Sequence, residues 1–195
     1  MNWRPGSFDY GIGWWAAALQ AGHVVIDTAE RRLPLRHGHH RYSVCGPNGA
    51  QQLTIPLVAS TRTIDTPLSD VLISEHAHWR RVHWGALYSA YGRTPYFDHA
   101  APVLEPIFNG HQTHLLDFNR QMQQVVTDFM QLPIVFDYYP LKRSESIEEP
   151  VAIRDVRYYQ VWQSRHGFIP GLSILDLMMN EGPEGIFTLM RMCSE

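Results

Sequence analysis

The sequence predicts an α/β fold, in which a small mixed sheet begun by a βαβ-like unit is covered by a helix-rich C-terminal half; a mixed α+β fold is the alternative. Segments with strand character concentrate in the first 75 of the 195 residues, and residues 75–131 show helical periodicity. Near the start, the helix-prone segment WWAAALQA (14–21) leads directly into the apolar segment HVVID (23–27). A helix between two strands favours parallel pairing, which is the basis for the βαβ-like start. The length fits a single domain over residues 1–195.

Glycine, proline and small polar residues punctuate the rest of the first half. Gly22 is expected to end the first helix. The segments 42–45 and 51–58 flank GPNG, which predicts a hairpin. Residues 70–73 (DVLI) are expected to add another strand, and Ser74 is a good N-cap for the helix that follows.

The middle of the chain is expected to contain three helices. They cover residues 75–92, 99–109 and 114–131, and Pro102 and Pro106 should limit the second helix. The apolar positions of the third helix fall on one face. They are Leu115, Phe118, Met122, Val125, Val126 and Phe129.

Towards the C-terminus, residues 135–139 are expected to return to a strand, and the polar residues 142–155 to form a loop. Ser173 can cap a helix over residues 174–180, and Gly182 can end it.

Composition excludes several classes of function. The formal net charge of −3 indicates neither a nucleic-acid footprint nor attraction to an anionic membrane surface. The longest apolar runs fall short of the ~20 residues that a membrane span needs, and the N-terminus lacks a signal-peptide pattern. The only cysteines, Cys45 and Cys193, fit no zinc or disulfide framework. We therefore expect a cytoplasmic protein with a small-molecule substrate, and the sequence assigns no cofactor and no oligomeric state.

The segment PGSFD (5–9), followed by a helix and a strand, is similar to the opening of the nucleotidylyltransferases. That chemistry needs cationic groups aimed at the phosphates. Trp14 and Trp15 stand where that family has an imidazole, and an indole cannot exchange a proton. The segment STR (60–62) lies too early for the later motif of that family. This activity is therefore a minor alternative.

Four longer segments resemble the WbqC-like protein family and follow one another in the order that the family has. They are HRYSVCGPNGAQQLTIPL (40–57), HWRRVHWGALYSAYGRTPYFD (78–98), HLLDFN (114–119) and YYQVWQSRHGFIPGLSILDLMMNEGPE (158–184), the last similar to the Bacteroidetes branch. The resemblance implies a bacterial protein linked to the assembly of surface polysaccharide, including O-antigen. It also implies the transfer of an amino-acyl or related group to an amino sugar.

The chain departs from that family before the hairpin. The family usually has a Lys and then an Asn–Arg pair there. In ERRLPLRHGHHR, His40 and Arg41 occupy the position of the Asn–Arg pair, and no Lys lies between Glu30 and Arg41. This member has therefore lost the Lys or replaced it with Arg or His.

Trp79, His83, Leu87 and Tyr91 recur every four residues and form one stripe on the predicted helix. His83 is a candidate general acid or base, because its ordinary pKa is close to neutral pH. Trp79 and Tyr91 could stack on a sugar or a base. The alternative is a helix packed into the core with a hydrogen-bonded histidine. The family resemblance includes Trp79, His83 and Tyr91 in its motif.

A second candidate site is a basic cluster, which consists of Arg36, His37, His39, His40 and Arg41. It could bind a phosphate or carboxylate, with Arg41 as a bidentate donor. A solvated loop and a metal site are the alternatives. Because the spacing indicates no third ligand, we assign no metal.

Acidic residues supply further candidates. Asp27 and Glu30 follow the second strand, and the carboxyl end of a parallel strand is a usual ligand position. Either acid could be a base or bind sugar hydroxyls, and a solvated strand end is the alternative. Asp98 could orient His83 or cap the next helix.

Two polar residues, Asn119 and Asp176, sit on otherwise apolar helices and need buried partners. We expect them to belong to structural networks. No sequence motif supports a covalent nucleophile.

These features predict a transferase-like enzyme of lipopolysaccharide and other surface-polysaccharide precursors, acting on a nucleotide-linked or amino sugar. Its predicted acid–base residues are His83 and Glu30. Its predicted substrate-binding residues are Arg41, His40, Trp79, Tyr91 and Asp98. The competing hypothesis is a non-catalytic protein that binds a glycan precursor or a partner protein.

Overall fold

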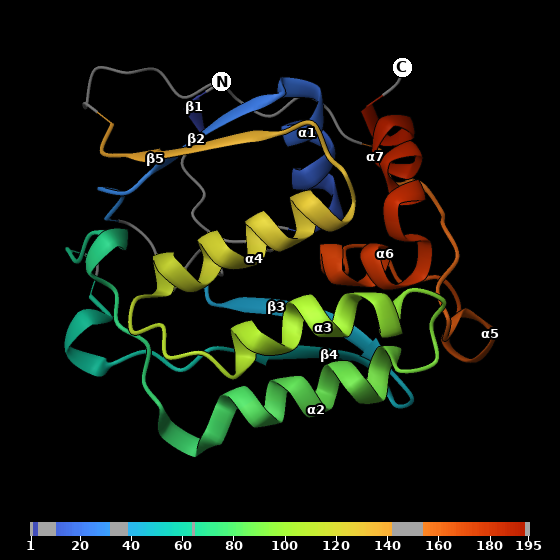
Figure 1. Cartoon of the computed structure of the whole chain (residues 1–195), viewed down its shortest axis with the longest axis horizontal. Helices are drawn as coiled ribbons and strands as arrows, with labels where there is room; N and C mark the ends of the chain where they lie inside the picture. The colour runs from blue at the N-terminus through green and yellow to red at the C-terminus, as the bar shows by residue number, and fades with distance from the viewer. Residues whose placement is uncertain (1, 4–10, 32–38, 64, 142–153, 194–195) are drawn as a thin grey trace.

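The computed structural model describes residues 2–3, 11–31, 39–63, 65–141 and 154–193, and it confirms the α/β class (Figure 1). Helices pack around two small sheets, and the C-terminal half is rich in helices. The elements are β1 (Asn2–Trp3), α1 (Ile12–Ala21), β2 (His23–Asp27), β3 (Arg41–Gly46), β4 (Gly49–Thr54), α2 (Trp79–Tyr91), α3 (Phe97–Phe108), α4 (Leu115–Phe129), β5 (Val135–Tyr139), α5 (Gln163–His166), α6 (Ile174–Glu181) and α7 (Gly185–Cys193).

A parallel sheet with the strand order β1-β2-β5 opens the fold, so the predicted parallel start is confirmed. Gly22 ends α1 in the left-handed conformation, with φ of 69°, and its N–H donates to the Ala18 carbonyl. Gly22 is therefore the whole connection between α1 and β2, because β2 begins at His23. The predicted strand over residues 135–139 is also confirmed, and it pairs with the whole length of β2.

The hairpin β3–β4 forms a second, antiparallel sheet. Parallel and antiparallel pairs thus occupy two separate sheets rather than a single mixed one. The strand predicted over residues 51–58 is too long, since β4 ends at Thr54 and Pro56 has no N–H to donate. The predicted strand over residues 70–73 contributes only two isolated bridges, Leu57–Ile73 and Leu72–His114.

Helix α2 begins at Trp79, later than predicted. Ser74 does not cap it; its hydroxyl accepts a hydrogen bond from the His76 N–H instead. Ala77 and His78 have φ of 60° and 48°, and this conformation interrupts the path into the α-helix. Helix α3 runs through both of its prolines, so the expectation that they limit it is wrong. Both proline side chains are exposed.

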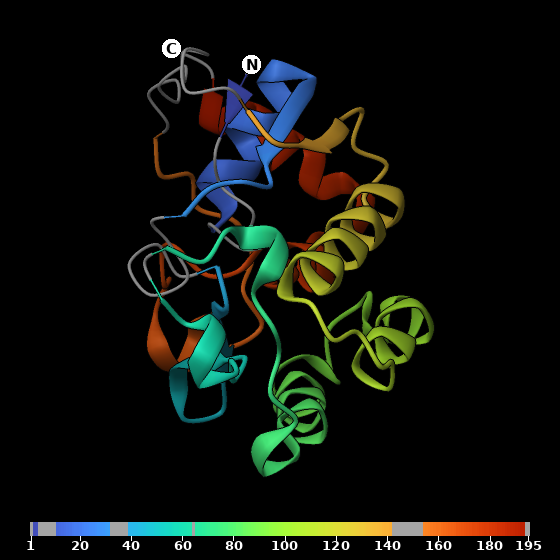
Figure 2. The same ribbon diagram turned by 90° about the vertical axis from the view of Figure 1, so that its left-hand side faces the viewer.

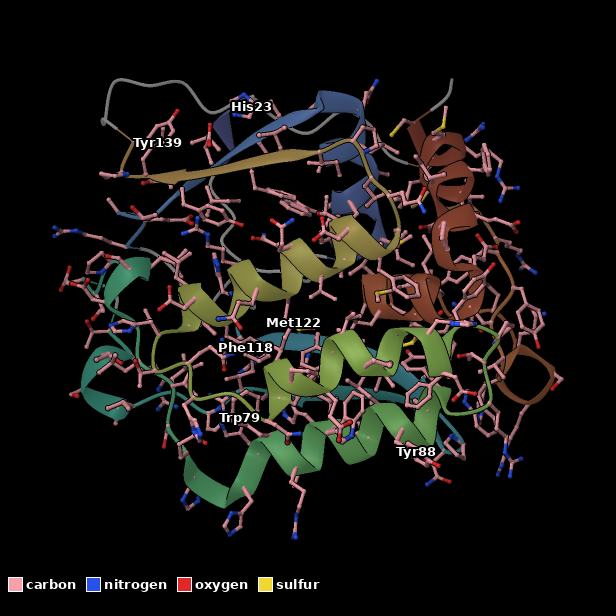
Figure 3. All side chains as sticks on the ribbon, viewed as in Figure 1. His23, Trp79, Tyr88, Phe118, Met122 and Tyr139 are labelled. Carbon is pink, nitrogen blue, oxygen red and sulfur yellow. The ribbon has the colours of Figure 1, made fainter. Side chains whose placement is uncertain are left out.

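Helix α4 lies between the parallel sheet and the pair α2–α3 in both views (Figures 1 and 2). Trp79, Phe118 and Met122 lie in the interior, whereas Tyr88 lies on the outer side of α2 (Figure 3). The predicted apolar face of α4 is confirmed: the residues Leu115, Phe118, Met122 and Val126 are fully buried, and Val125 and Phe129 are partly buried. Asn119 and Gln123 are also buried on this helix.

The C-terminal helices complete the core. Ser173 caps α6 as predicted, because its hydroxyl accepts from the Leu175 N–H at 3.2 Å. Helix α6 is buried from Ile174 to Asn180, and α7 packs against α1. The loop predicted over residues 142–155 lies almost wholly outside the described residues. Within the described part of the chain, every helix is too short or too polar to cross a membrane.

Candidate functional site

The stripe on α2 is buried, as its periodicity predicts. Trp79, His83, Leu87 and Tyr91 are each 3% exposed or less. The Trp79 ring meets His83 and Phe118 edge-on, with centroid separations of 5.0 and 5.5 Å. These are the contacts of a helix packed into the core, which is the alternative that the sequence left open.

Tyr91 is buried with its hydroxyl in a polar network. Its oxygen accepts from the Cys45 N–H at 3.3 Å, and burial raises the pKa of Tyr91 well above its ordinary value. Tyr158 donates to Asp176 Oδ2 at 2.6 Å, and Gln160 donates to the Tyr158 hydroxyl. Burial raises the pKa of Asp176 to about 6, and its hydrogen bonds with Tyr158, Tyr91 and Gln160 oppose that rise. Asp176 thus lies in a buried network, as expected.

His83 is held by the hairpin. Its Nδ1 lies 2.9 Å from the Tyr42 hydroxyl, and a hydrogen bond with the Thr54 backbone engages the ring as well. Burial lowers the pKa of His83 to about 4, although the Thr54 bond opposes the shift. The ring is therefore neutral near pH 7. If its Nε2–H donates to the Thr54 carbonyl, Nδ1 accepts from Tyr42 and both nitrogens are satisfied.

Asp98 lies apart from the hydrogen bonds of His83. It is exposed in the first turn of α3, where its charge favours the positive end of the helix dipole. The N-cap of α3 is Tyr96, so the expectation that Asp98 caps this helix is wrong.

The carboxyl ends of the parallel strands carry acidic residues, in contrast to the aromatic surroundings of the α2 stripe. Parallel strands end at the same edge, and there Asp27 Oδ1 accepts from the N–H groups of Ala29 and Leu141, both at 3.0 Å. The Asp27 carboxylate therefore joins the segment after β2 to the segment after β5. The Glu30 carbonyl accepts from the Leu68 N–H at 2.9 Å, which fixes the next part of this turn.

Glu30 and His39 meet at this edge. Glu30 Oε2 lies 3.9 Å from His39 Nε2, and the side chains are 13% and 0% exposed. The Asn119 amide donates to the His39 carbonyl at 3.1 Å, so α4 helps to hold His39 in place. We call Glu30, His39 and Asn119 the edge cluster. A carboxylate beside a buried imidazole can accept and stabilise a proton.

The sequence had indicated this cluster only in part. Glu30 was a candidate because of its position after a strand. His39 appeared only within the basic cluster, and Asn119 only as a polar residue on an apolar helix. That polar residue was the available signal for a contact across the core.

The other residues of the basic cluster lie in different environments. His40 is 3% exposed, and its carbonyl accepts from the Ile55 N–H at 2.7 Å. Arg41 is exposed at the start of β3. Arg36 and His37 lie outside the described residues. Among the residues that are described, no group of three or more His, Cys, Asp or Glu side chains could hold a metal ion.

The segment PGSFD also lies outside the described residues, but the two tryptophans after it do not. Trp14 and Trp15 are buried, and the Trp14 ring stacks on Phe136 with a centroid separation of 5.8 Å. Both indoles therefore pack against Phe136 of β5 as core side chains, and neither supplies the imidazole of a nucleotidylyltransferase.

Comparison with known proteins gives one match. No curated protein and no solved structure matches the chain. The sequence model of the WbqC-like protein family matches residues 24–152, which extend from β2 past the end of β5. This range is more than half of the 195 residues and includes both the α2 stripe and the edge cluster. The chain therefore belongs to the WbqC-like protein family.

Proposed function

We propose that the protein is a transferase of surface-polysaccharide precursors, with its reacting groups at the edge cluster. The observation that carries this proposal is the Glu30 carboxylate 3.9 Å from the His39 ring, at the carboxyl end of a parallel strand. Ligands of α/β proteins usually bind at that end of the sheet. Family membership supports the polysaccharide part of the proposal, because the family resemblance implies that setting.

Glu30 is the proposed proton acceptor because part of its side chain remains exposed, whereas His39 is fully buried. In acyl or amino-acyl transfer, the acceptor hydroxyl or amine attacks the acyl carbonyl and gives its proton to Glu30. The bond to the leaving group then breaks, and the leaving group takes that proton. His39 is the proposed positioning residue, because its ring lies 3.9 Å from the Glu30 carboxylate.

Arg41 is the proposed holder of an anionic part of the donor, because its exposed guanidinium can bind phosphate or carboxylate through two N–H groups. His83, Trp79, Tyr91 and Asp98 have no place in this proposal. The first three have the geometry of core residues, and Asp98 is exposed at the start of α3.

The test is a turnover screen, in which nucleotide-linked sugars and amino sugars are combined with acyl and amino-acyl donors and products are detected by mass spectrometry. Glu30→Gln keeps the shape of the side chain but removes the proton acceptor. We expect it to lower kcat/KM by about 10²-fold or more. His23→Asn is the matched control, because His23 is an exposed histidine at the other end of β2.

Turnover of the Glu30→Gln variant at the rate of the unmodified protein would contradict the proposed site. Sugar binding by the protein, without any product in the screen, would instead support the competing hypothesis of a non-catalytic glycan-binding protein.

A further inference from the structure

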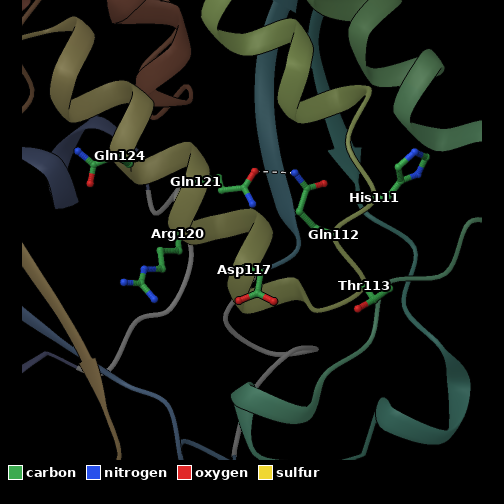
Figure 4. Close-up of a pocket in the computed structure, with 7 residues that line it drawn as sticks. All are labelled: His111, Gln112, Thr113, Asp117, Arg120, Gln121 and Gln124. Atoms are coloured by element: carbon green, nitrogen blue, oxygen red, sulfur yellow. Dashed lines mark hydrogen bonds between the residues drawn. The ribbon is translucent and has the colours of Figure 1, made fainter.

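A polar groove of about 650 Å³ lies beside helix α4 and the loop that precedes it (Figure 4). Its lining comes from the loop 111–113 and from Asp117, Arg120, Gln121 and Gln124 of the helix. All of its lining side chains are polar. The volume falls within the range of small-molecule sites, about 300–1,000 Å³. These side chains can form hydrogen bonds to a polar ligand.

The loop side of the groove is held in place from the interior. Arg80 is 9% exposed, and its Nη1 and Nη2 donate to the side-chain and backbone oxygens of Gln112 at 2.9 and 2.8 Å. Gln112 Nε2 then donates to Gln121 Oε1 at 2.6 Å (Figure 4). A buried guanidinium thus orients two amides of the groove before any ligand binds, which lowers the entropic cost of binding.

The two glutamines of α4 present opposite hydrogen-bonding groups. Gln121 uses its oxygen for Gln112, so its amide nitrogen is the group that can donate to a ligand. Gln124 donates its nitrogen to Asp128 Oδ1 at 2.8 Å, so its oxygen is the group that can accept. A donor and an acceptor one helical turn apart match neighbouring hydroxyls, because a hydroxyl can both donate and accept.

The charges of the groove nearly cancel. Asp117 contributes a carboxylate, and Arg120 contributes a guanidinium that lies 4.8 Å from the centre of the Tyr138 ring. The Tyr138 hydroxyl in turn donates to Gln123 Oε1 at 2.6 Å, so the ring under Arg120 is fixed. A nearly neutral groove does not favour polyphosphate or nucleic acid, whose binding depends on clustered cations.

We infer that this groove binds a saccharide unit through its hydroxyl groups. The groove and the edge cluster share helix α4, since Arg120 lines the groove and the preceding residue, Asn119, donates to the His39 carbonyl. We therefore assign it the acceptor part of the substrate. This last assignment rests on the proposed function, whereas saccharide binding itself does not.

The test is an NMR titration of the full chain that follows the side-chain amides of Gln121 and Gln124. The probes are galactose, N-acetylglucosamine, galacturonate and maltotriose, with inorganic phosphate and decanoate as negative probes. At least one saccharide should move both amide signals. Gln121→Met and Gln124→Met should each weaken its Kd about tenfold, the effect of one lost hydrogen bond. Gln52→Met, at an exposed glutamine of β4, should leave the Kd unchanged.

The inference is overturned if none of the saccharides moves these signals, or if both methionine variants bind as tightly as the unmodified protein. Saccharide binding in the groove without turnover by any donor would leave the inference intact and count against the proposed function. Turnover with an unchanged KM for the sugar in both methionine variants would support the proposed function and count against the groove as the acceptor site.

Discussion

The α2 stripe and the edge cluster both bury an imidazole, but they surround it differently. His83 lies among aromatic rings and bonds to the Tyr42 hydroxyl. His39 faces the Glu30 carboxylate at the end of a parallel strand. The first environment keeps a ring neutral and fixed, whereas the second pairs a ring with a group that can take a proton. We therefore base the proposed site on the charge of the histidine's partner and on its place at the end of the sheet, and not on burial alone.

The largest effect on stability should come from the core side of this comparison. Trp79→Ala removes a buried indole that contacts His83 and Phe118, and should lower the free energy of unfolding by about 3–5 kcal/mol. Tyr88→Ala is the control on the same helix, because Tyr88 is 65% exposed and should cost about 1 kcal/mol or less. Urea unfolding measures both. Equal losses would mean that the stripe is not part of the core.

The pH dependence of stability should reveal His83 as a neutral core residue. The pKa of His83 is lowered from 6.5 to about 4, so the unfolded chain binds the proton more readily than the folded one. Its contribution to stability is therefore present above pH 6.5, and about 3 kcal/mol is lost as the pH falls to about 4. In urea titrations across this range, His83→Gln should lack this loss. An identical pH profile for the variant would contradict the assignment.

Asp176 should have the opposite pH dependence. Its pKa is raised from 3.8 to about 6, so the folded chain holds the proton more tightly. Stability from this group is greatest below pH 3.8, and about 3 kcal/mol is lost as the pH rises through about 6. The slopes of His83 and Asp176 should therefore nearly cancel between about pH 4 and pH 6. Asp176→Asn should expose the His83 slope, and a flat profile in that variant would refute this account.

A smaller loss is expected at the edge cluster. Asn119→Ala removes the donor to the His39 carbonyl and should lower the free energy of unfolding by about 1–3 kcal/mol. Because His39 would lose a support, turnover should also fall by more than the loss of folded protein explains. Gln52→Ala serves as the exposed control. A variant that lost stability but kept full turnover per folded molecule would show that Asn119 does not position the site.

Local signals in the sequence were enough to predict much of the fold. The end of α1 at Gly22, the hairpin around GPNG and the cap at Ser173 depend on residues close together in the chain. Residues 70–73 were predicted as a strand, but they form only isolated bridges. Their partners, Leu57 and His114, are distant in the sequence, and no local pattern indicates them. The separation of the strands into two sheets is likewise a property of the packed chain.

Of the three residues of the edge cluster, the sequence predicted a catalytic role only for Glu30. A position just after a parallel strand was enough to indicate Glu30. His39 and Asn119 are 80 residues apart in the sequence, and only the packing of α4 beside the sheet brings them together. The spacing of the α2 stripe was correct, but a four-residue repeat is the same for a helix that lines a pocket and one that fills a core.

The most direct test of the account is an NMR titration of backbone amides with the sugar substrate that the turnover screen identifies. We expect the amide signals of residues 28–31 and 39–41 to shift, together with those of the groove residues 111–124 where the acceptor sugar binds, while those of α2, from Trp79 to Tyr91, stay in place. Shifts confined to α2 and the hairpin around Tyr42 and His83 would contradict the account and return the site to the α2 stripe.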